Sequence, residues 1–205
     1  MDMFYYENNA RKVSLTNICG IDEAGRGPLA GAVYAAAVIL PEGIDIEGLN
    51  DSKQVPEKKR EQLFDIIKEK AIDFCIASAS ENEIDTYNIL NATFMAMKRA
   101  VAGLKTKPEI ILVDGNQDPK FEIPTLCIVK GDSKSASIAA ASILAKVARD
   151  RYMVELDKQY PQYMLAQHKG YPTKLHYEMI EKYGIAPIHR KSFLKKILNS
   201  SKEIL

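Results

Sequence analysis

The chain has 205 residues, of which 46% are apolar, and its 28 lysines and arginines nearly balance 27 aspartates and glutamates. This length predicts one domain with room for a substantial core. The net charge of +1 excludes a polycation that holds nucleic acid by bulk charge, so any such binding must depend on how the charges are distributed. That distribution is uneven, because residues 160–205 hold eight basic and three acidic side chains.

The cysteines and the N-terminus indicate a cellular compartment. Cys19, Cys75 and Cys127 lie singly in apolar stretches without a CxxC pair, a pattern typical of buried thiols in a reducing compartment. The N-terminus has no apolar segment of the signal-peptide type, and no run approaches the ~18 apolar residues of a membrane span. We therefore expect a cytoplasmic protein with no membrane partner.

The first part of the chain predicts three strands and one helix. Residues 17–22 and 31–40 are short apolar runs separated by a glycine-rich turn, and residues 72–77 alternate with the period of two of a half-buried strand. Between the second and third strands, residues 56–70 carry an apolar stripe, and Pro56 suits the first position of a helix. We expect the three strands to form a meander.

The rest of the chain alternates helices with two further strands. Ser80 and Glu83 have the spacing of a capping box, and apolar residues then recur every three or four positions until Gly103. The other predicted elements are strands at 110–113 and 125–129 and helices at 133–153, 175–183 and 193–198. This order predicts an α/β fold with a mixed sheet of about five strands flanked by helices. We expect a single domain over residues 1–205, with a catalytic core over about 17–155 and a basic helical C-terminal lobe over about 160–205.

Acidic residues follow three of the predicted strands: Asp22 with Glu23, then Asp114, then Asp132. Chemistry in open α/β sheets gathers at the carboxyl ends of strands, and carboxylates crowded there repel one another unless hard cations bind among them. Mg²⁺ and Mn²⁺ prefer oxygen ligands. Two such ions about 3.5–4 Å apart can activate water and stabilise the leaving oxygen in phosphodiester displacement. The four acids are therefore candidate metal ligands and catalytic groups.

Each acid also has a structural interpretation. Asp132 precedes a predicted helix start, where an acid can cap the helix, and Asp114 with Gly115 can form a plain turn. Asp22 and Glu23 have no obvious structural use between an apolar strand and a glycine loop. Neighbouring strand residues point to opposite faces, however, so Glu23 would act through a bent backbone or through its carbonyl.

A second motif overlaps the first acids. The segment 25–30 fits the G-x-G-x-x-G/A pattern of dinucleotide-binding sites, with Asp45 as a candidate ribose ligand. A pyrophosphate there would meet Asp22 and Glu23, and the following segment stops at Pro41, which favours a strand over a crossover helix. We therefore expect no nucleotide cofactor.

Five motifs occur in an order that closely resembles ribonuclease HII, the bacterial type 2 ribonuclease H. They are GIDEAGRGPLAGAV at 20–33, DSK at 51–53, VDG at 113–115, KGDS at 130–133 and QHKGYPT at 167–173. The resemblance runs from about Ile18 to Phe193. The related ribonuclease HIII carries a long N-terminal substrate-binding domain, and the position of Asp22 near the start of the chain favours type HII.

The resemblance implies a ribonuclease H-like fold and a metal-dependent endonuclease. Such an enzyme uses Mn²⁺ or Mg²⁺, with two ions in the active complex, and leaves 5′-phosphate and 3′-hydroxyl ends. Its substrates are RNA–DNA hybrids and duplex DNA containing ribonucleotides, which it nicks on the 5′ side of the ribonucleotide in ribonucleotide excision repair. The family's four acids fall on Asp22, Glu23, Asp114 and Asp132, and a monomer is expected. The alternative is a hybrid-binding module of the same fold without activity, which would lack one of these acids.

The resemblance also assigns contacts to the substrate. Gly25, Arg26 and Gly27 match a Gly-Arg-Gly loop whose backbone approaches the ribose 2′-hydroxyl, and Tyr171 matches a tyrosine that stacks on the adjacent deoxyribose. Only glycine lets backbone come this near a sugar, and the 2′-hydroxyl is the group that distinguishes RNA from DNA.

Three lysines are candidate phosphate contacts: Lys53, Lys146 and Lys169. Each has the alternative of being a solvated surface lysine. The tail over residues 191–205 has the composition of an amphipathic helix, which we expect to pack on its own domain rather than on a protein partner.

Overall fold

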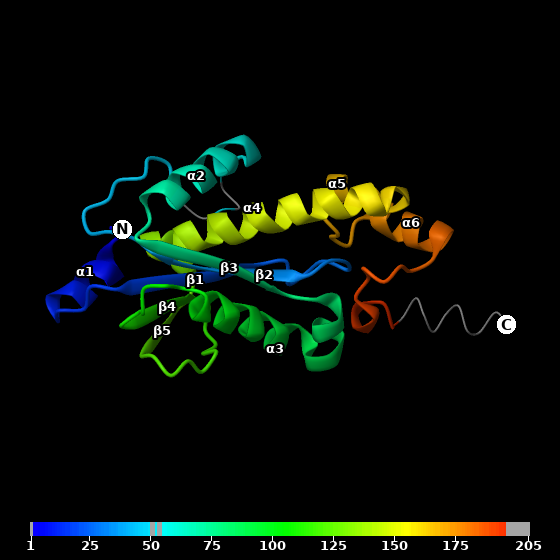
Figure 1. The fold of residues 1–205 in the computed structure, drawn as a ribbon. Helices are drawn as coiled ribbons and strands as arrows, with labels where there is room; N and C mark the ends of the chain where they lie inside the picture. The colour runs from blue at the N-terminus through cyan, green and yellow to red at the C-terminus, as the bar shows by residue number, and fades with distance from the viewer. Residues whose placement is uncertain (1, 50–51, 53–54, 196–205) are drawn as a thin grey trace.

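A central sheet lies between two layers of helices in the computed structural model, which describes residues 2–49, 52 and 55–195 (Figure 1). The strands are β1 (Ile18–Ala24), β2 (Val33–Ile39), β3 (Asp73–Ala79), β4 (Ile110–Asp114) and β5 (Thr125–Ile128). The α-helices are α1 (Tyr5–Lys12), α2 (Glu57–Lys70), α3 (Glu81–Ala102), α4 (Ala136–Gln159), α5 (Leu165–His168) and α6 (Lys174–Tyr183). Short 3₁₀ turns occur at Gly131–Ser133, Pro161–Tyr163 and Lys191–Phe193.

The sheet has the strand order β3-β2-β1-β4-β5. β1, β2 and β3 pair antiparallel as the predicted meander, whereas β4 pairs parallel with β1 and β5 pairs parallel with β4. The predicted mixed sheet of five strands is therefore confirmed. Because β1, β4 and β5 are parallel, their carboxyl ends meet at one edge of the sheet.

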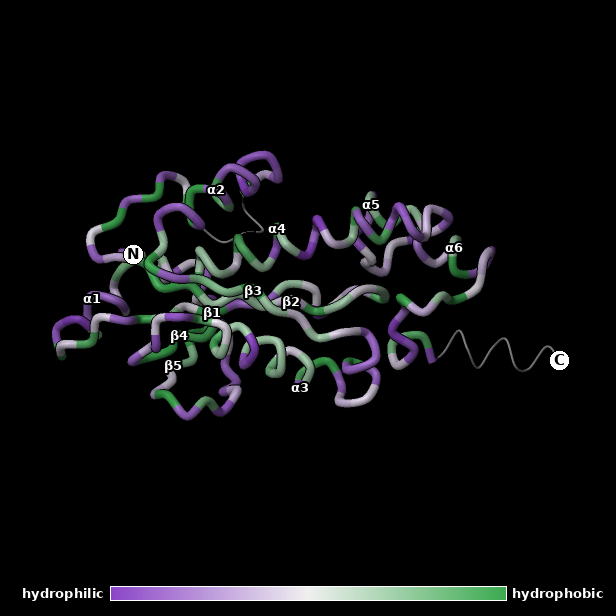
Figure 2. Tube along the Cα trace, viewed as in Figure 1, coloured by the Kyte–Doolittle hydropathy of each residue, from purple (hydrophilic) through white to green (hydrophobic). Residues whose placement is uncertain are grey.

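Two apolar layers hold the helices on the sheet. α4 lies along β1 and β2 on one face with α2 packed outside it, and α3 covers β2 and β3 on the other face (Figure 1). Leu63 of α2 and Ala140 of α4 belong to the first apolar cluster, and Ile84 and Met97 of α3 belong to the second. In Figure 2 the apolar segments follow the strands and the helix faces turned toward them, while the outer part of α2 is hydrophilic.

The contact between α4 and β1 is unusually close. A Cβ placed on Gly20 of β1 would lie 2.1 Å from the carbonyl carbon of Ser137 and 2.3 Å from the nitrogen of Ile138. The facing side of α4 carries small residues, including the buried Ala139 and Ala140. The first turn of α4 is thereby placed directly over β1, just before the acidic end of that strand.

Gly20→Ala should lower the free energy of unfolding by about 1–3 kcal/mol, because the added methyl meets backbone that cannot move without displacing α4. Chemical denaturation measures this change. Gly27→Ala is the matched control, since a Cβ at Gly27 meets only an ordinary contact of 3.8 Å. Equal stability of Gly20→Ala and the wild type would contradict this account.

The start of α4 differs from the prediction. The helix runs over Ala136–Gln159 rather than 133–153, and Ser135 caps it by accepting a hydrogen bond from the nitrogen of Ile138 at 3.3 Å. Asp132 therefore lies in the preceding 3₁₀ turn and is not the cap. Glu7 of α1, a helix not predicted from the sequence, accepts hydrogen bonds from the Ser135 hydroxyl at 2.7 Å and the Ser137 nitrogen at 3.0 Å. This buried carboxylate stabilises the positive end of the α4 dipole.

Helix α3 contains a kink that was not predicted from the sequence. The capping box of Ser80 and Glu83 is present, but Asn88 leaves the helical conformation with φ 66° and kinks α3. Tyr87, just before the kink, is 51% exposed. Residues 196–198 of the helix predicted at 193–198 lie outside the described residues, and its first residue, Phe193, ends a 3₁₀ turn. None of the helices in the described ranges is long and apolar enough to cross a membrane.

Candidate active site

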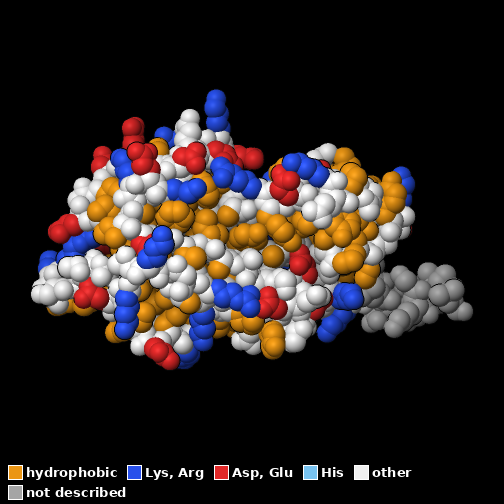
Figure 3. Space-filling view, in the orientation of Figure 1, with side chains coloured by type: hydrophobic (Ala, Val, Ile, Leu, Met, Phe, Trp, Pro, Cys, Tyr) orange, Lys and Arg blue, Asp and Glu red, His pale blue; other side chains and the backbone are white. Residues whose placement is uncertain are grey.

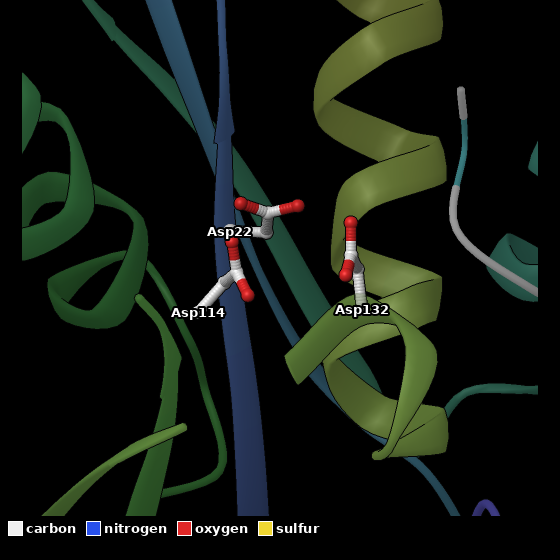
Figure 4. Close-up of side chains that lie close together, drawn as sticks. All are labelled: Asp22, Asp114 and Asp132. Atoms are coloured by element: carbon white, nitrogen blue, oxygen red, sulfur yellow. The ribbon is translucent and has the colours of Figure 1, made fainter. Parts of the chain in front are cut away.

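The register of the sheet places two aspartates side by side. Ile21 of β1 pairs with Val113 of β4, so Asp22 and Asp114 occupy the next position on neighbouring parallel strands. Paired residues of parallel strands point to the same face. Both carboxylates lie beside the first turns of α4 (Figure 4).

The turn between β5 and α4 adds the third aspartate. Lys130 adopts the left-handed conformation with φ 56°, and the nitrogen of Gly131 donates a hydrogen bond to Asp114 Oδ1 at 2.6 Å. This contact fixes the turn so that Asp132 points at Asp22 and Asp114. One carboxylate oxygen from each aspartate lies within 4.8 Å of the other two (Figure 4). We call these residues the three-aspartate cluster.

The cluster concentrates negative charge at a largely buried place. Asp22 is 3% exposed and Asp132 is 5% exposed. Burial, followed by the charges of Glu23 and Asp114, raises the pKa of Asp22 well above its usual range. Hydrogen bonds from the Ser142 hydroxyl and from the nitrogen of Glu23 oppose that rise. A crowded, buried set of carboxylate oxygens fits a hard divalent cation such as Mg²⁺ or Mn²⁺, which would neutralise the repulsion.

Glu23 lies on the other face of the sheet from this cluster. Successive strand residues alternate between faces, so Glu23 points toward α3 and lines a cavity of about 80 Å³ together with Phe94 and Met97. Its carboxylate pairs with Arg26 at 3.4 Å. Of the four candidate acids, the structure brings the carboxylates of Asp22, Asp114 and Asp132 together. Glu23 adjoins them through its backbone nitrogen, which donates to Asp22, and lines the same cavity as Asp114.

The predicted Gly-Arg-Gly loop directly follows β1. Gly25 has φ +98°, and a Cβ there would lie 2.0 Å from Arg149 Nε, so both conformation and space require glycine. The loop leads into β2, an antiparallel strand, rather than into the crossover helix of a dinucleotide-binding fold. Tyr171, which is 39% exposed, comes to the loop from the distant C-terminal part of the chain. Its Cε1 lies 3.8 Å from the Cβ position of Gly27.

The three candidate lysines have different surroundings. Lys146 Nζ pairs with Asp150 at 2.7 Å and lies 5.9 Å from the ring centroid of Tyr171, so the structure brings it to the loop. The Lys169 ammonium donates to the carbonyl of Ala166, folding back onto α5. Lys53 lies outside the described residues.

Charged side chains of both signs are mixed on the face shown in Figure 3, where Lys and Arg are interspersed with Asp and Glu.

Three residues near the site were missed by the sequence analysis. Ser142, in the alanine-rich part of α4, bonds Asp22 and lies 2.8 Å from the hydroxyl of Ser52. Arg149 and Arg190 are both 0% exposed. Their sequence neighbourhoods do not distinguish them from surface arginines, because the groups that they bind lie far away along the chain.

Three buried histidines support the segment that carries Tyr171. His176 Nδ1 contacts the Tyr171 carbonyl at 3.1 Å, and the Tyr171 nitrogen donates to the His168 carbonyl at 2.9 Å. The rings of His168 and His176 stack at 4.3 Å, and His189 contacts His176 at 3.3 Å. Burial, followed by the charge of His168, lowers the pKa of His176 to about 4. Burial also lowers the pKa of His168 and of His189.

Stability should therefore fall as the pH drops from about 6.5 toward 4. The unfolded chain takes up protons near pH 6.5, whereas the buried rings resist protonation, so acid favours unfolding. The loss from His176 alone amounts to about 2 kcal/mol at pH 5. Urea denaturation at pH 7 and pH 5 measures it. His176→Gln, which does not titrate, should show a shallower pH dependence, and an unchanged dependence would contradict the assignment.

Comparison with known proteins agrees with this geometry. The family profile described as Ribonuclease HII matches residues 19–196. Ribonuclease HII of Clostridioides difficile (strain 630) is 57% identical over 94% of this chain and 76% of its own, and that of Acetivibrio thermocellus (strain ATCC 27405) is 56% identical over 97% and 77%.

Solved structures share the fold. Ribonuclease H2 from Pyrococcus horikoshii OT3 has a TM-score of 0.72 at 30% identity, over 86% of this chain and 93% of that chain. Bst-RNase HIII in complex with Mn²⁺ has a TM-score of 0.65 at 18% identity, over 85% and 65%. The resemblance inferred from the motifs is confirmed, and the chain belongs to the ribonuclease HII family.

Proposed function

We propose that this protein is a metal-dependent type 2 ribonuclease H that hydrolyses the RNA strand of RNA–DNA hybrids and nicks duplex DNA on the 5′ side of an embedded ribonucleotide. The observation that carries the proposal is the three-aspartate cluster at the carboxyl ends of β1 and β4, beside the Gly-Arg-Gly loop and Tyr171. A metal site next to an exposed glycine loop is suited to act on a phosphate beside a sugar that the loop contacts.

The cluster supplies the ligands for catalysis. Asp22, Asp114 and Asp132 would hold Mg²⁺ or Mn²⁺, with two ions in the active complex and Glu23 contributing from the adjoining backbone. When bound, such ions neutralise charge on the scissile phosphate and lower the pKa of the attacking water. Ser142 holds the Asp22 carboxylate in place, and burial of the cluster strengthens every electrostatic interaction within it.

The surroundings of the cluster supply substrate recognition. The backbone at Gly25, Arg26 and Gly27 would contact the ribose 2′-hydroxyl, and Tyr171 would stack on the neighbouring deoxyribose. Lys146, held by Asp150 near the Tyr171 ring, would contact a phosphate. Lys53 and Lys169 remain candidates for further phosphates of the same strand.

The test is cleavage of a DNA duplex that contains one ribonucleotide, across a series of Mg²⁺ and Mn²⁺ concentrations. We expect a single nick on the 5′ side of the ribonucleotide, with 5′-phosphate and 3′-hydroxyl ends, and no cleavage of the all-DNA duplex. Absence of nicking with either ion would contradict the proposal. Tight binding to a hybrid without cleavage at any metal concentration would instead support an inactive hybrid-binding module.

A further inference from the structure

Arg190 is a buried arginine that binds the Gly-Arg-Gly loop only through main-chain oxygens. Its guanidinium donates hydrogen bonds to the carbonyls of Gly25 at 2.7 Å, Arg26 at 3.0 Å, Pro28 at 2.9 Å and Gly31 at 2.8 Å. Its side chain is 0% exposed, and within the described part of the chain no carboxylate forms an ion pair with it. A buried charge is costly unless it is well hydrogen-bonded, so this arrangement holds the loop strongly in one conformation.

The bonds to Arg190 determine which way two peptide units of the loop point. A trans peptide is planar, and its C=O and N–H point in opposite directions; the described chain contains no cis peptide. The carbonyl of Gly25 shares a peptide unit with the nitrogen of Arg26, and the carbonyl of Arg26 shares one with the nitrogen of Gly27. Because Arg190 holds both carbonyls inward, both N–H groups point away from it. Arg26 and Gly27 are the exposed residues of the loop.

We propose that Arg190 is the positioning residue for ribonucleotide recognition: by holding the carbonyls of Gly25 and Arg26, it presents the N–H groups of Arg26 and Gly27 to the 2′-hydroxyl oxygen. This inference rests on the proposed function. The required geometry explains the residue type, because a planar guanidinium offers five donors in a fixed fork whereas an ammonium offers three from one atom. Through Arg190, the C-terminal segment would thus help to position the loop for the 2′-hydroxyl, although the two are far apart along the chain.

Arg149 provides a comparison within the same structure. It is equally buried, and it donates to the carbonyls of Ala30 at 3.3 Å, Ala32 at 3.2 Å and Lys169 at 3.1 Å. These carbonyls lie after the Gly-Arg-Gly loop or in the Tyr171 segment. Arg149→Lys therefore removes a comparable guanidinium while leaving the peptide units of Arg26 and Gly27 bound to Arg190.

The experiment measures binding by the full chain in EDTA, which prevents cleavage. Two duplexes are compared that differ only in one ribonucleotide, and the readout is the ratio of their Kd values. Arg190→Lys should lower the preference for the ribonucleotide by about tenfold, the loss expected when hydrogen bonds to one hydroxyl are misdirected, while leaving the Kd for the all-DNA duplex unchanged. Arg149→Lys should keep the preference within about twofold of wild type.

Gly27→Pro serves as a second variant if Arg190→Lys does not fold, because it deletes one of the two N–H donors and leaves Arg190 in place. It should also lower the preference. An unchanged preference in Arg190→Lys or in Gly27→Pro would overturn the inference, as would equal losses in Arg190→Lys and Arg149→Lys. A wild-type protein that binds both duplexes equally would contradict the proposed function itself, which distinguishes the two failures.

Discussion

Asp22→Asn should abolish nicking while making the metal-free protein more stable. Asp22 is the most buried member of the three-aspartate cluster, and burial with the nearby charges of Glu23 and Asp114 raises its pKa. Without a cation, the folded protein therefore carries the unfavourable buried charge of Asp22. Asparagine removes this charge and keeps a side-chain oxygen that accepts the hydrogen bonds from Ser142 and from the nitrogen of Glu23. Loss of a group that only supports a metal ligand lowers activity by up to about 100-fold. Because Asp22 would itself be a ligand, the rate of nicking by Asp22→Asn should fall by more than that.

Two measurements separate these effects. In the wild type, Mn²⁺ at about 100 times its Kd should raise the free energy of unfolding by about 2.7 kcal/mol, and Asp22→Asn should show little of this rise. Without metal, the wild type should lose stability as the pH rises through the elevated pKa of Asp22, because the folded state binds the extra proton. Asp45→Asn, at an exposed acid outside the cluster, is the matched control. Full nicking by Asp22→Asn would remove this residue from the site.

Tyr171→Ala should reduce kcat/KM for the ribonucleotide-containing duplex by about 5- to 150-fold, the equivalent of losing one stacking contact of about 1–3 kcal/mol. The ring is 39% exposed and lies at the loop, with Lys146 Nζ at 5.9 Å and the Arg149 guanidinium at 5.7 Å from its centroid. Lys146 would draw a phosphate to the side of the ring where a sugar can stack.

Steady-state kinetics on the single-ribonucleotide duplex measures this effect. Tyr171→Phe should keep most of the activity, because stacking needs the ring and not the hydroxyl. Tyr177→Ala removes a tyrosine of similar exposure, 41%, from α6 and should leave kcat/KM unchanged. A Tyr171→Ala enzyme with wild-type kinetics would place this tyrosine outside the substrate site.

Most of the fold could be predicted because its signals are local. The five strands appear as short apolar or alternating runs, and the Ser80 capping box marks the start of α3 within three residues of sequence. Errors occurred where a local signal had two interpretations. The predicted start of α4 at residue 133, directly after an acid that can cap a helix, is wrong, because Ser135 has the extended backbone of the cap and accepts a hydrogen bond from the nitrogen of Ile138.

The proximity of the three aspartates could be predicted for the same reason. Asp22, Asp114 and Asp132 stand at or after the ends of parallel strands, and such ends meet wherever the strands pair in register. Glu23 follows Asp22 in sequence but faces α3, as the alternation of strand residues requires.

By itself the sequence determined the family, the α/β class and the acids that can bind a metal, since each of these depends on short motifs and on the period of apolar residues. Only the tertiary structure decided which groups hold those motifs in place. Glu7 at the start of α4, the histidines behind Tyr171 and the carbonyl partners of Arg190 are contacts between residues far apart in the chain. Such contacts arise when distant segments are buried together, because a buried charge or ring nitrogen must find its hydrogen-bond partners there.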